Sequence, residues 1–91
     1  MPPDETNTEA AATLALGALS WVVADSERAR RFLDITGIAP ETLRERANTP
    51  SFLAATIGYL ENHEPDLIAC AEALAVAPED LTRARRTLET R

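Results

Sequence analysis

The residues with the greatest capacity for chemistry are His63 and Cys70, which are the only histidine and the only cysteine of the chain. His63 stands beside Glu64 and Asp66, and an imidazole with two carboxylates could bind a metal ion or supply a general acid. Such a metal site would lack a second strong ligand, and such an acid would lack an orienting partner. We therefore interpret the trio as a turn between helices, with acidic residues that cap the second helix.

Cys70 does not indicate a reactive site either. A lone cysteine excludes an internal disulfide and a cysteine-based metal cage, and we expect its side chain to be buried as a small apolar group. The chain has no glycine-rich phosphate loop, no Ser/His/Asp set and no dinucleotide-binding motif. The sequence thus predicts a protein that is not an enzyme, with no cofactor, metal or small-molecule ligand.

Arginine is the remaining residue type that could form a binding site, because the chain has nine arginines and no lysine. Five arginines and three acids give residues 28–46 a net charge of +2, within a chain of net charge −6. An acidic chain does not favour nucleic acid, since phosphate contacts supply most non-specific affinity. We treat eight arginines as a candidate interaction surface: Arg28, Arg30, Arg31, Arg44, Arg46, Arg83, Arg85 and Arg86.

Proline and capping residues divide the chain into helices that must position these side chains. Four prolines precede helical patterns, where the missing N–H and the restricted φ suit the first helical turn: Pro40, Pro50, Pro65 and Pro78. The pattern predicts helices over about 8–24, 26–36, 40–47, 50–62, 65–75 and 78–89, and no strand. We expect a disordered tail over 1–7 and a single, compact, all-α domain of six helices over 8–91.

A weak internal repeat indicates how these helices are grouped. Ile38 to Leu43 resembles Val76 to Leu81 at a separation of 38 residues, and the same offset places the only Trp, Trp21, on the only Tyr, Tyr59. This predicts pseudo-repeats over 13–47 and 51–85, with a possible pseudo-twofold axis between two three-helix units.

Small residues form a strip in the first and fourth expected helices. The strips are Thr13, Gly17, Ser20 and Ala24 in one helix, and Ser51, Ala55, Gly58 and Asn62 in the other. Small side chains allow two helix backbones to approach closely, so one hypothesis is that these helices cross through their strips and form the centre of the domain. The alternative is that the small residues mark the solvent side.

Residues 14–24 form an apolar run that resembles part of a secretory signal. The segment before it contains acids and no basic residue, the reverse of a signal peptide, and the run is too short to span a bilayer. We therefore expect a cytoplasmic protein without membrane association.

Several segments resemble a bacterial family of small proteins, of alphaproteobacterial type, known as domain of unknown function 3572. They are residues 16–21 (LGALSW), 31–38 (RFLDITGI), 43–44 (LR), 50–54 (PSFLA), 78–79 (PE) and 84–88 (ARRTL). The resemblance covers roughly residues 10–89. It implies a small all-helical protein with no assigned activity and no catalytic residues to transfer. Cys70 stands where relatives tend to have an aromatic residue.

Two classes of function remain. We favour a non-enzymatic helical module that interacts with an unknown protein partner or with itself, which an exposed apolar patch would support. The alternative is a nucleic-acid-associated regulator that uses the arginines of the second and third helices. A basic surface unbroken by Asp34 and Glu45 would support this alternative.

Overall fold

The computed structural model describes residues 3–90, and within that range the protein is built entirely from α-helices. The six helices are α1 (Pro3–Ala24), α2 (Ser26–Thr36), α3 (Pro40–Arg46), α4 (Pro50–Glu61), α5 (Glu64–Ala73) and α6 (Pro78–Glu89). The predicted all-α fold with six helices is confirmed. Helix α1 begins at Pro3 and not at residue 8, so part of the segment expected as a tail is helical; residues 1 and 2 lie outside the described residues.

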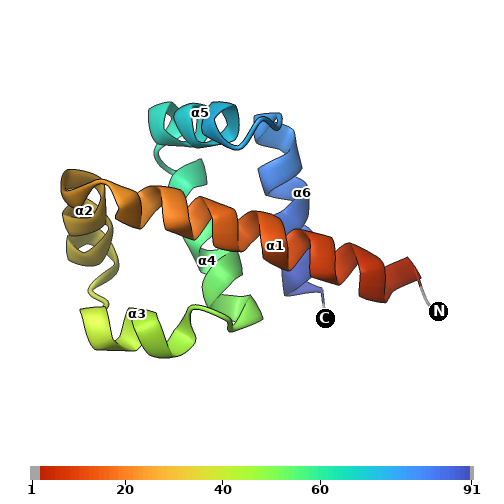
Figure 1. Ribbon diagram of the computed structural model, residues 1–91, viewed down its shortest axis with the longest axis horizontal. Coiled ribbons are helices and arrows are strands. Elements are labelled where there is room, and N and C mark those ends of the chain that lie inside the picture. The colour runs from red at the N-terminus through yellow and green to blue at the C-terminus, as the bar shows by residue number, and fades with distance from the viewer. Residues whose placement is uncertain (1–2, 91) are drawn as a thin grey trace.

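Three helices form the centre of the molecule. Helix α1 crosses α4 and α6 on one side of the domain, and α4 and α6 also pack against each other (Figure 1). Helix α2 turns back from the end of α1, α3 leads to α4, and α5 connects α4 with α6. The core combines aliphatic, alanine and aromatic side chains of these helices, among them Leu19, Val22, Phe32, Phe52, Leu53, Ile57, Leu60 and Leu81.

Helices α2, α3, α4 and α6 begin where the local chemistry predicts. Pro40, Pro50 and Pro78 are the first residues of α3, α4 and α6, where no intrahelical partner for an N–H is lost. Helix α2 is capped by Asp25, whose carboxylate accepts a hydrogen bond from the Arg28 N–H at 2.9 Å. These starts depend on neighbouring residues alone, which is why the sequence predicts them well.

Helices α1 and α4 are central, as expected, but they do not cross through their small-residue strips, so that part of the hypothesis is wrong. A Cβ added at Gly17 would lie 3.4 Å from a methyl carbon of Leu74 at the end of α5, and one added at Gly58 would lie 3.8 Å from the Arg85 side chain of α6. The other residues of both strips are exposed: Thr13, Ser20, Ala24, Ser51, Ala55 and Asn62. The alternative is therefore confirmed for these six residues, which mark the solvent side.

The two expected three-helix units are packed differently. Helix α6 buries Leu81, Ala84 and Leu88, whereas α3, its counterpart in the repeat, buries no residue. Tyr59 is buried, but Trp21 is only half-buried. The pseudo-twofold axis therefore stays a prediction.

Candidate interaction surface

Arg28 is bound to the end of α1. Its guanidinium donates hydrogen bonds to the Trp21 carbonyl from Nη2 at 2.6 Å and from Nε at 3.2 Å. The same group lies over the Trp21 ring, 3.8 Å from the centroid. The last four carbonyls of a helix have no intrahelical partner, so Arg28 satisfies one of them. Its side chain therefore links the ends of α1 and α2 and is occupied by this role.

Arg31 is also paired, and its partner is on α5. Its Nη2 lies 2.7 Å from Oδ2 of Asp66. The neighbouring phenol of Tyr59 and the Asp66 carboxylate raise the pKa of Arg31 above its ordinary value. The Tyr59 hydroxyl is buried and, among the described residues, makes no hydrogen bond. The ion pair between Arg31 and Asp66 connects two helices that have few other contacts.

Arg85 belongs to a polar network on the outside of α4 and α6. It forms an ion pair with Glu61 of α4 and a second one with Glu89, at 2.7 Å. Glu61 also accepts a hydrogen bond from the Thr82 hydroxyl at 2.8 Å. The two carboxylates raise the pKa of Arg85, with Glu61 the larger cause. This network fixes the Arg85 side chain beside Gly58.

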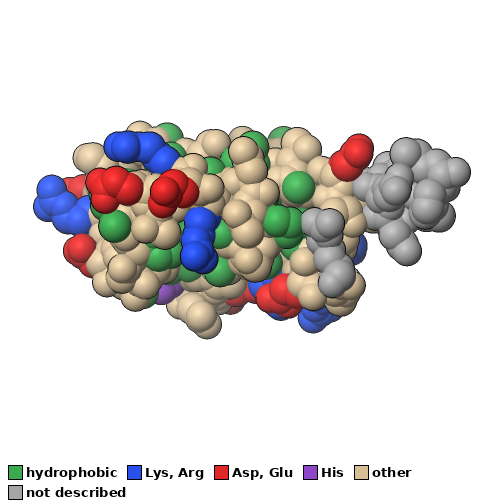
Figure 2. All heavy atoms as spheres, turned by 90° about the horizontal axis from the view of Figure 1, so that it is seen from below, with side chains coloured by type: hydrophobic (Ala, Val, Ile, Leu, Met, Phe, Trp, Pro, Cys, Tyr) green, Lys and Arg blue, Asp and Glu red, His purple; other side chains and the backbone are tan. Residues whose placement is uncertain are grey.

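The other arginines do not form one basic surface. Arg83 forms an ion pair with Asp80 at 3.0 Å on the exposed side of α6. No ion pair within the described part of the chain involves the remaining candidates, which are Arg30, Arg44, Arg46 and Arg86. Figure 2, which views the side of α3, shows basic and acidic side chains interleaved.

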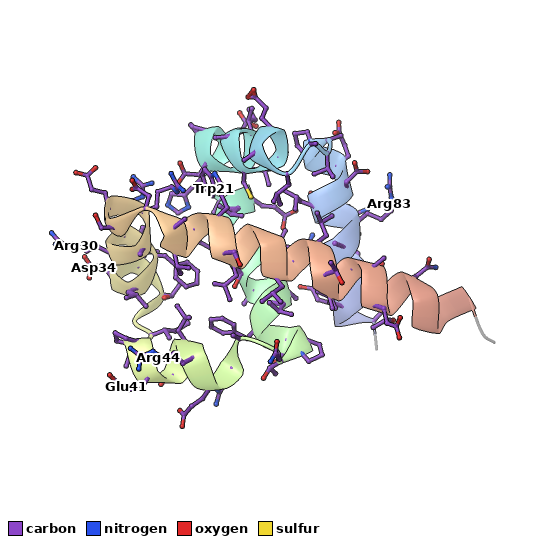
Figure 3. All side chains as sticks on the ribbon, in the orientation of Figure 1. Trp21, Arg30, Asp34, Glu41, Arg44 and Arg83 are labelled. Atoms are coloured by element: carbon purple, nitrogen blue, oxygen red, sulfur yellow. The ribbon has the colours of Figure 1, made fainter. Side chains whose placement is uncertain are left out.

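Figure 3 shows that individual arginines lie apart from one another, each near acidic residues or alone. Arg30 and Asp34 project together from α2, and Glu41 and Arg44 lie together on α3, whereas Arg83 points outward from α6 at the other end of the molecule. The structure thus divides the eight candidate arginines among several local arrangements.

His63 and Cys70 are both held by structural contacts. The His63 ring stacks on Tyr59 with centroids 4.5 Å apart, and its Nδ1 lies 2.9 Å from the Tyr59 carbonyl oxygen. Cys70 is fully buried, which confirms the interpretation as a small core residue, and burial raises the pKa of its thiol to about 11. Among the described residues, no three His, Cys, Asp or Glu side chains are grouped so that they could hold a metal ion.

An uncharged, exposed surface lies on α1; solvent exposure of its small residues was one expectation from the sequence, but that of Leu16 and Val23 was not. We define the outer face of α1 as Thr13, Leu16, Ser20, Val23 and Ala24, all of which are exposed. Leu16 is 39% and Val23 is 42% exposed, and residues 10–24 include no charged side chain. The absence of charge was visible in the sequence, but the run over residues 14–24 was compared only with a secretory signal or a membrane span.

Helix α1 has 22 residues but is not apolar enough over that length to span a membrane. Within the described residues, no helix is both long enough and apolar enough to cross a bilayer. The outer face of α1 is therefore an exposed, uncharged surface on a helix whose opposite side, with Ala11, Ala15, Ala18, Leu19 and Val22, is part of the core.

A family model described as "Protein of unknown function (DUF3572)" matches residues 8–91. The chain therefore belongs to this family. Comparison with curated proteins finds no match, and neither does comparison with solved structures.

Proposed function

We propose that this member of the DUF3572 family is a cytoplasmic, non-enzymatic interaction module that binds another protein through the outer face of α1. The observation that carries this proposal is the exposure of Leu16 and Val23 on a helix without a charged residue over positions 10–24. The solvent side of a helix in a globular protein normally carries charged and polar residues. An exposed face without charge can be covered by another molecule without the desolvation of a charge.

The energetics of this face favour association. Leu16 and Val23 each leave about two-fifths of their surface exposed, and covering that surface would contribute roughly 1 kcal/mol for each side chain. Thr13, Ser20 and Ala24 are short, so a partner backbone can approach α1 closely beside the two larger residues. A partner would therefore gain apolar burial without having to desolvate a charge.

The distribution of arginines supports a protein partner over a nucleic acid. Arg28 and Arg31 are occupied by Trp21 and Asp66, and acidic residues accompany the exposed arginines of α2 and α3. Phosphate binding requires cations that are free to contact successive phosphates. The alternative role as a nucleic-acid-associated regulator has less support from this arrangement.

Photo-crosslinking in cells that express the protein natively tests the proposal. A benzoylphenylalanine is placed at Leu16 or at Val23, and in a control at Ile68, which is an exposed apolar residue of α5. We expect crosslinked products from positions 16 and 23 and none from position 68. Mass spectrometry then identifies the product as another protein or a second copy. Absence of products at both α1 positions, or equal products at position 68, would contradict the proposal.

A further inference from the structure

Helix α3 has the least packing of the six helices. It has seven residues, and none of them is buried. Each of the other described helices packs along at least one neighbour, whereas α3 does not pack closely along any helix. It lies at the edge of the molecule, between the end of α2 and the start of α4 (Figure 1). Its attachment to the fold therefore depends on a few side chains.

Three apolar side chains attach this part of the chain to the core. Ile38, Leu43 and Ala47 are partly buried and pack against the cluster of buried residues. The free energy gained by burial grows with the apolar area removed from water, so partly buried side chains contribute less than fully buried ones. The apolar attachment of α3 is therefore weaker than that of α4 or α6, which bury several side chains completely.

Polar contacts do not strengthen this attachment. Within the described part of the chain, residues 38–49 form no ion pair and no side-chain hydrogen bond with another helix. Their hydrogen bonds are with one another or with Thr36 and Leu53, which are near them in the chain. By contrast, ion pairs join α2 to α5 and α4 to α6.

Gly37 lies at the start of this segment and is suited to be a hinge. Its φ is 72°, and no atom lies within 4 Å of the position of a Cβ. Glycine adopts both signs of φ without a Cβ clash, so it tolerates large changes of backbone conformation. At the other end, Thr49 does not cap α4 with its side chain, so movement of the residues before it removes no side-chain hydrogen bond from that helix.

We propose that residues 38–49 form a strap that detaches from the core as a unit, with Gly37 as the hinge, while α1, α4 and α6 remain folded. A segment with few buried apolar contacts opens at a lower free energy than the whole domain. Helices α1, α4 and α6 pack on one another, so their mutual contacts persist when the strap opens. Detachment uncovers Ile38, Leu43 and Ala47 together with the part of the core that they cover, so the open form presents apolar surface in addition to the outer face of α1.

Native-state amide hydrogen exchange of the full chain, followed by NMR at urea concentrations below the unfolding transition, tests this inference. We expect the hydrogen-bonded amides of α3 to have protection factors that are similar to one another and at least about tenfold lower than those of α4 and α6. We also expect the exchange of α3 to depend less on urea, because detachment of the strap exposes less surface than global unfolding does.

Two variants separate detachment of the strap from global unfolding. Leu43→Ala weakens the attachment itself and should accelerate exchange in α3, α4 and α6 alike, by roughly fivefold. Leu81→Val is the matched control, because Leu81 is fully buried in α6, which remains folded when the strap opens. It should accelerate exchange in α4 and α6 by roughly fivefold and leave exchange in α3 unchanged.

Four outcomes would overturn the inference. Equal protection and equal urea dependence in α3 and α4 would show that the strap opens only when the whole chain unfolds, and so would faster exchange of α3 in Leu81→Val. Protection that declines residue by residue from one end of α3 would indicate fraying and not detachment as a unit. Exchange of α3 at the rate of an unstructured peptide would show that the strap is not attached at all.

The strap does not depend on the proposed function of the outer face of α1. None of the residues that define that face belongs to the strap, so the crosslinking and the exchange experiments test separate claims.

Discussion

Gly37 and Ala75 are separated by 38 residues and share a left-handed backbone conformation, with φ of 72° and 59°. Each lies just beyond the end of a helix and precedes an apolar residue. The Gly37 N–H donates to the Leu33 carbonyl at 2.8 Å, and the Val76 N–H donates to the Ala71 carbonyl at 2.9 Å. These bonds satisfy carbonyls at the ends of α2 and α5. A left-handed residue thus precedes the repeated sequence in both halves, but the hydrogen bonds around it differ and only one of the two residues is glycine.

Replacing Ala75 by glycine and Gly37 by alanine should change the free energy of unfolding in opposite directions. Ala75→Gly removes the strain of a Cβ in the left-handed region and should raise the free energy of unfolding by about 1 kcal/mol. Gly37→Ala introduces that strain and should lower it by about the same amount. No atom lies within 4 Å of a Cβ at Gly37, so the effect there is one of backbone conformation. Urea denaturation measures both changes.

A control separates this effect from a general effect of glycine. Ala69 is exposed within α5, where a right-handed conformation is required, so Ala69→Gly should destabilise the protein by about 1 kcal/mol. Destabilisation by Ala75→Gly as well would show that the left-handed turn carries no strain at position 75.

Adjacent valines on α1 should respond differently to truncation. Val22 is 1% exposed and Val23 is 42% exposed. Val22→Ala should lower the free energy of unfolding by about 2 kcal/mol, because it removes buried methyl groups and leaves a cavity. Val23→Ala should change it by less than about 0.5 kcal/mol. Equal losses in urea denaturation would show that the outer face of α1 is covered in the free protein.

Removal of the Arg28 side chain should loosen the corner between α1 and α2. Arg28→Ala loses two hydrogen bonds to the Trp21 carbonyl and the contact with the ring, and should cost about 1 kcal/mol of unfolding free energy. Fluorescence of Trp21, the only tryptophan, should shift to the red as the ring becomes more exposed. Arg30→Ala is the matched control and should leave both observables unchanged. An unchanged emission spectrum in Arg28→Ala would contradict the contact.

Stability should fall in alkaline solution because of Cys70. Burial raises the pKa of the folded thiol from 9.0 to about 11, so the unfolded chain loses its proton first as the pH rises. The contribution of this thiol is complete below pH 9 and decreases between pH 9 and 11, by at most about 1.4 kcal/mol per pH unit. The difference in unfolding free energy between pH 8.5 and 10.5 should be smaller in Cys70→Ala. The same difference in both proteins would mean that the thiol titrates normally in the fold.

Much of the fold could be predicted because helix boundaries depend on nearby residues. Pro40, Pro50 and Pro78 suit the first turn of a helix whatever the helix packs against, and Asp25 reaches the N–H of Arg28 three residues away. The burial of Cys70 was also predicted correctly. The start of α1 was not, because Pro3 was assigned to a tail and not to the first turn of the helix.

The sequence by itself determined the helix content and most helix boundaries, because φ restrictions, caps and unpaired N–H groups are local. Only the tertiary structure decided which helix faces meet. Gly17 faces Leu74 and Gly58 faces Arg85, as a Cβ added at either glycine would show. Arg28 and Arg31 bind Trp21 and Asp66. A run of uncharged residues in a sequence is compatible with burial and with exposure of its outer side, so the sequence does not distinguish the two. The exposure of Leu16 and Val23 follows from how α1 crosses α4 and α6, and that crossing depends on contacts between residues far apart in the chain.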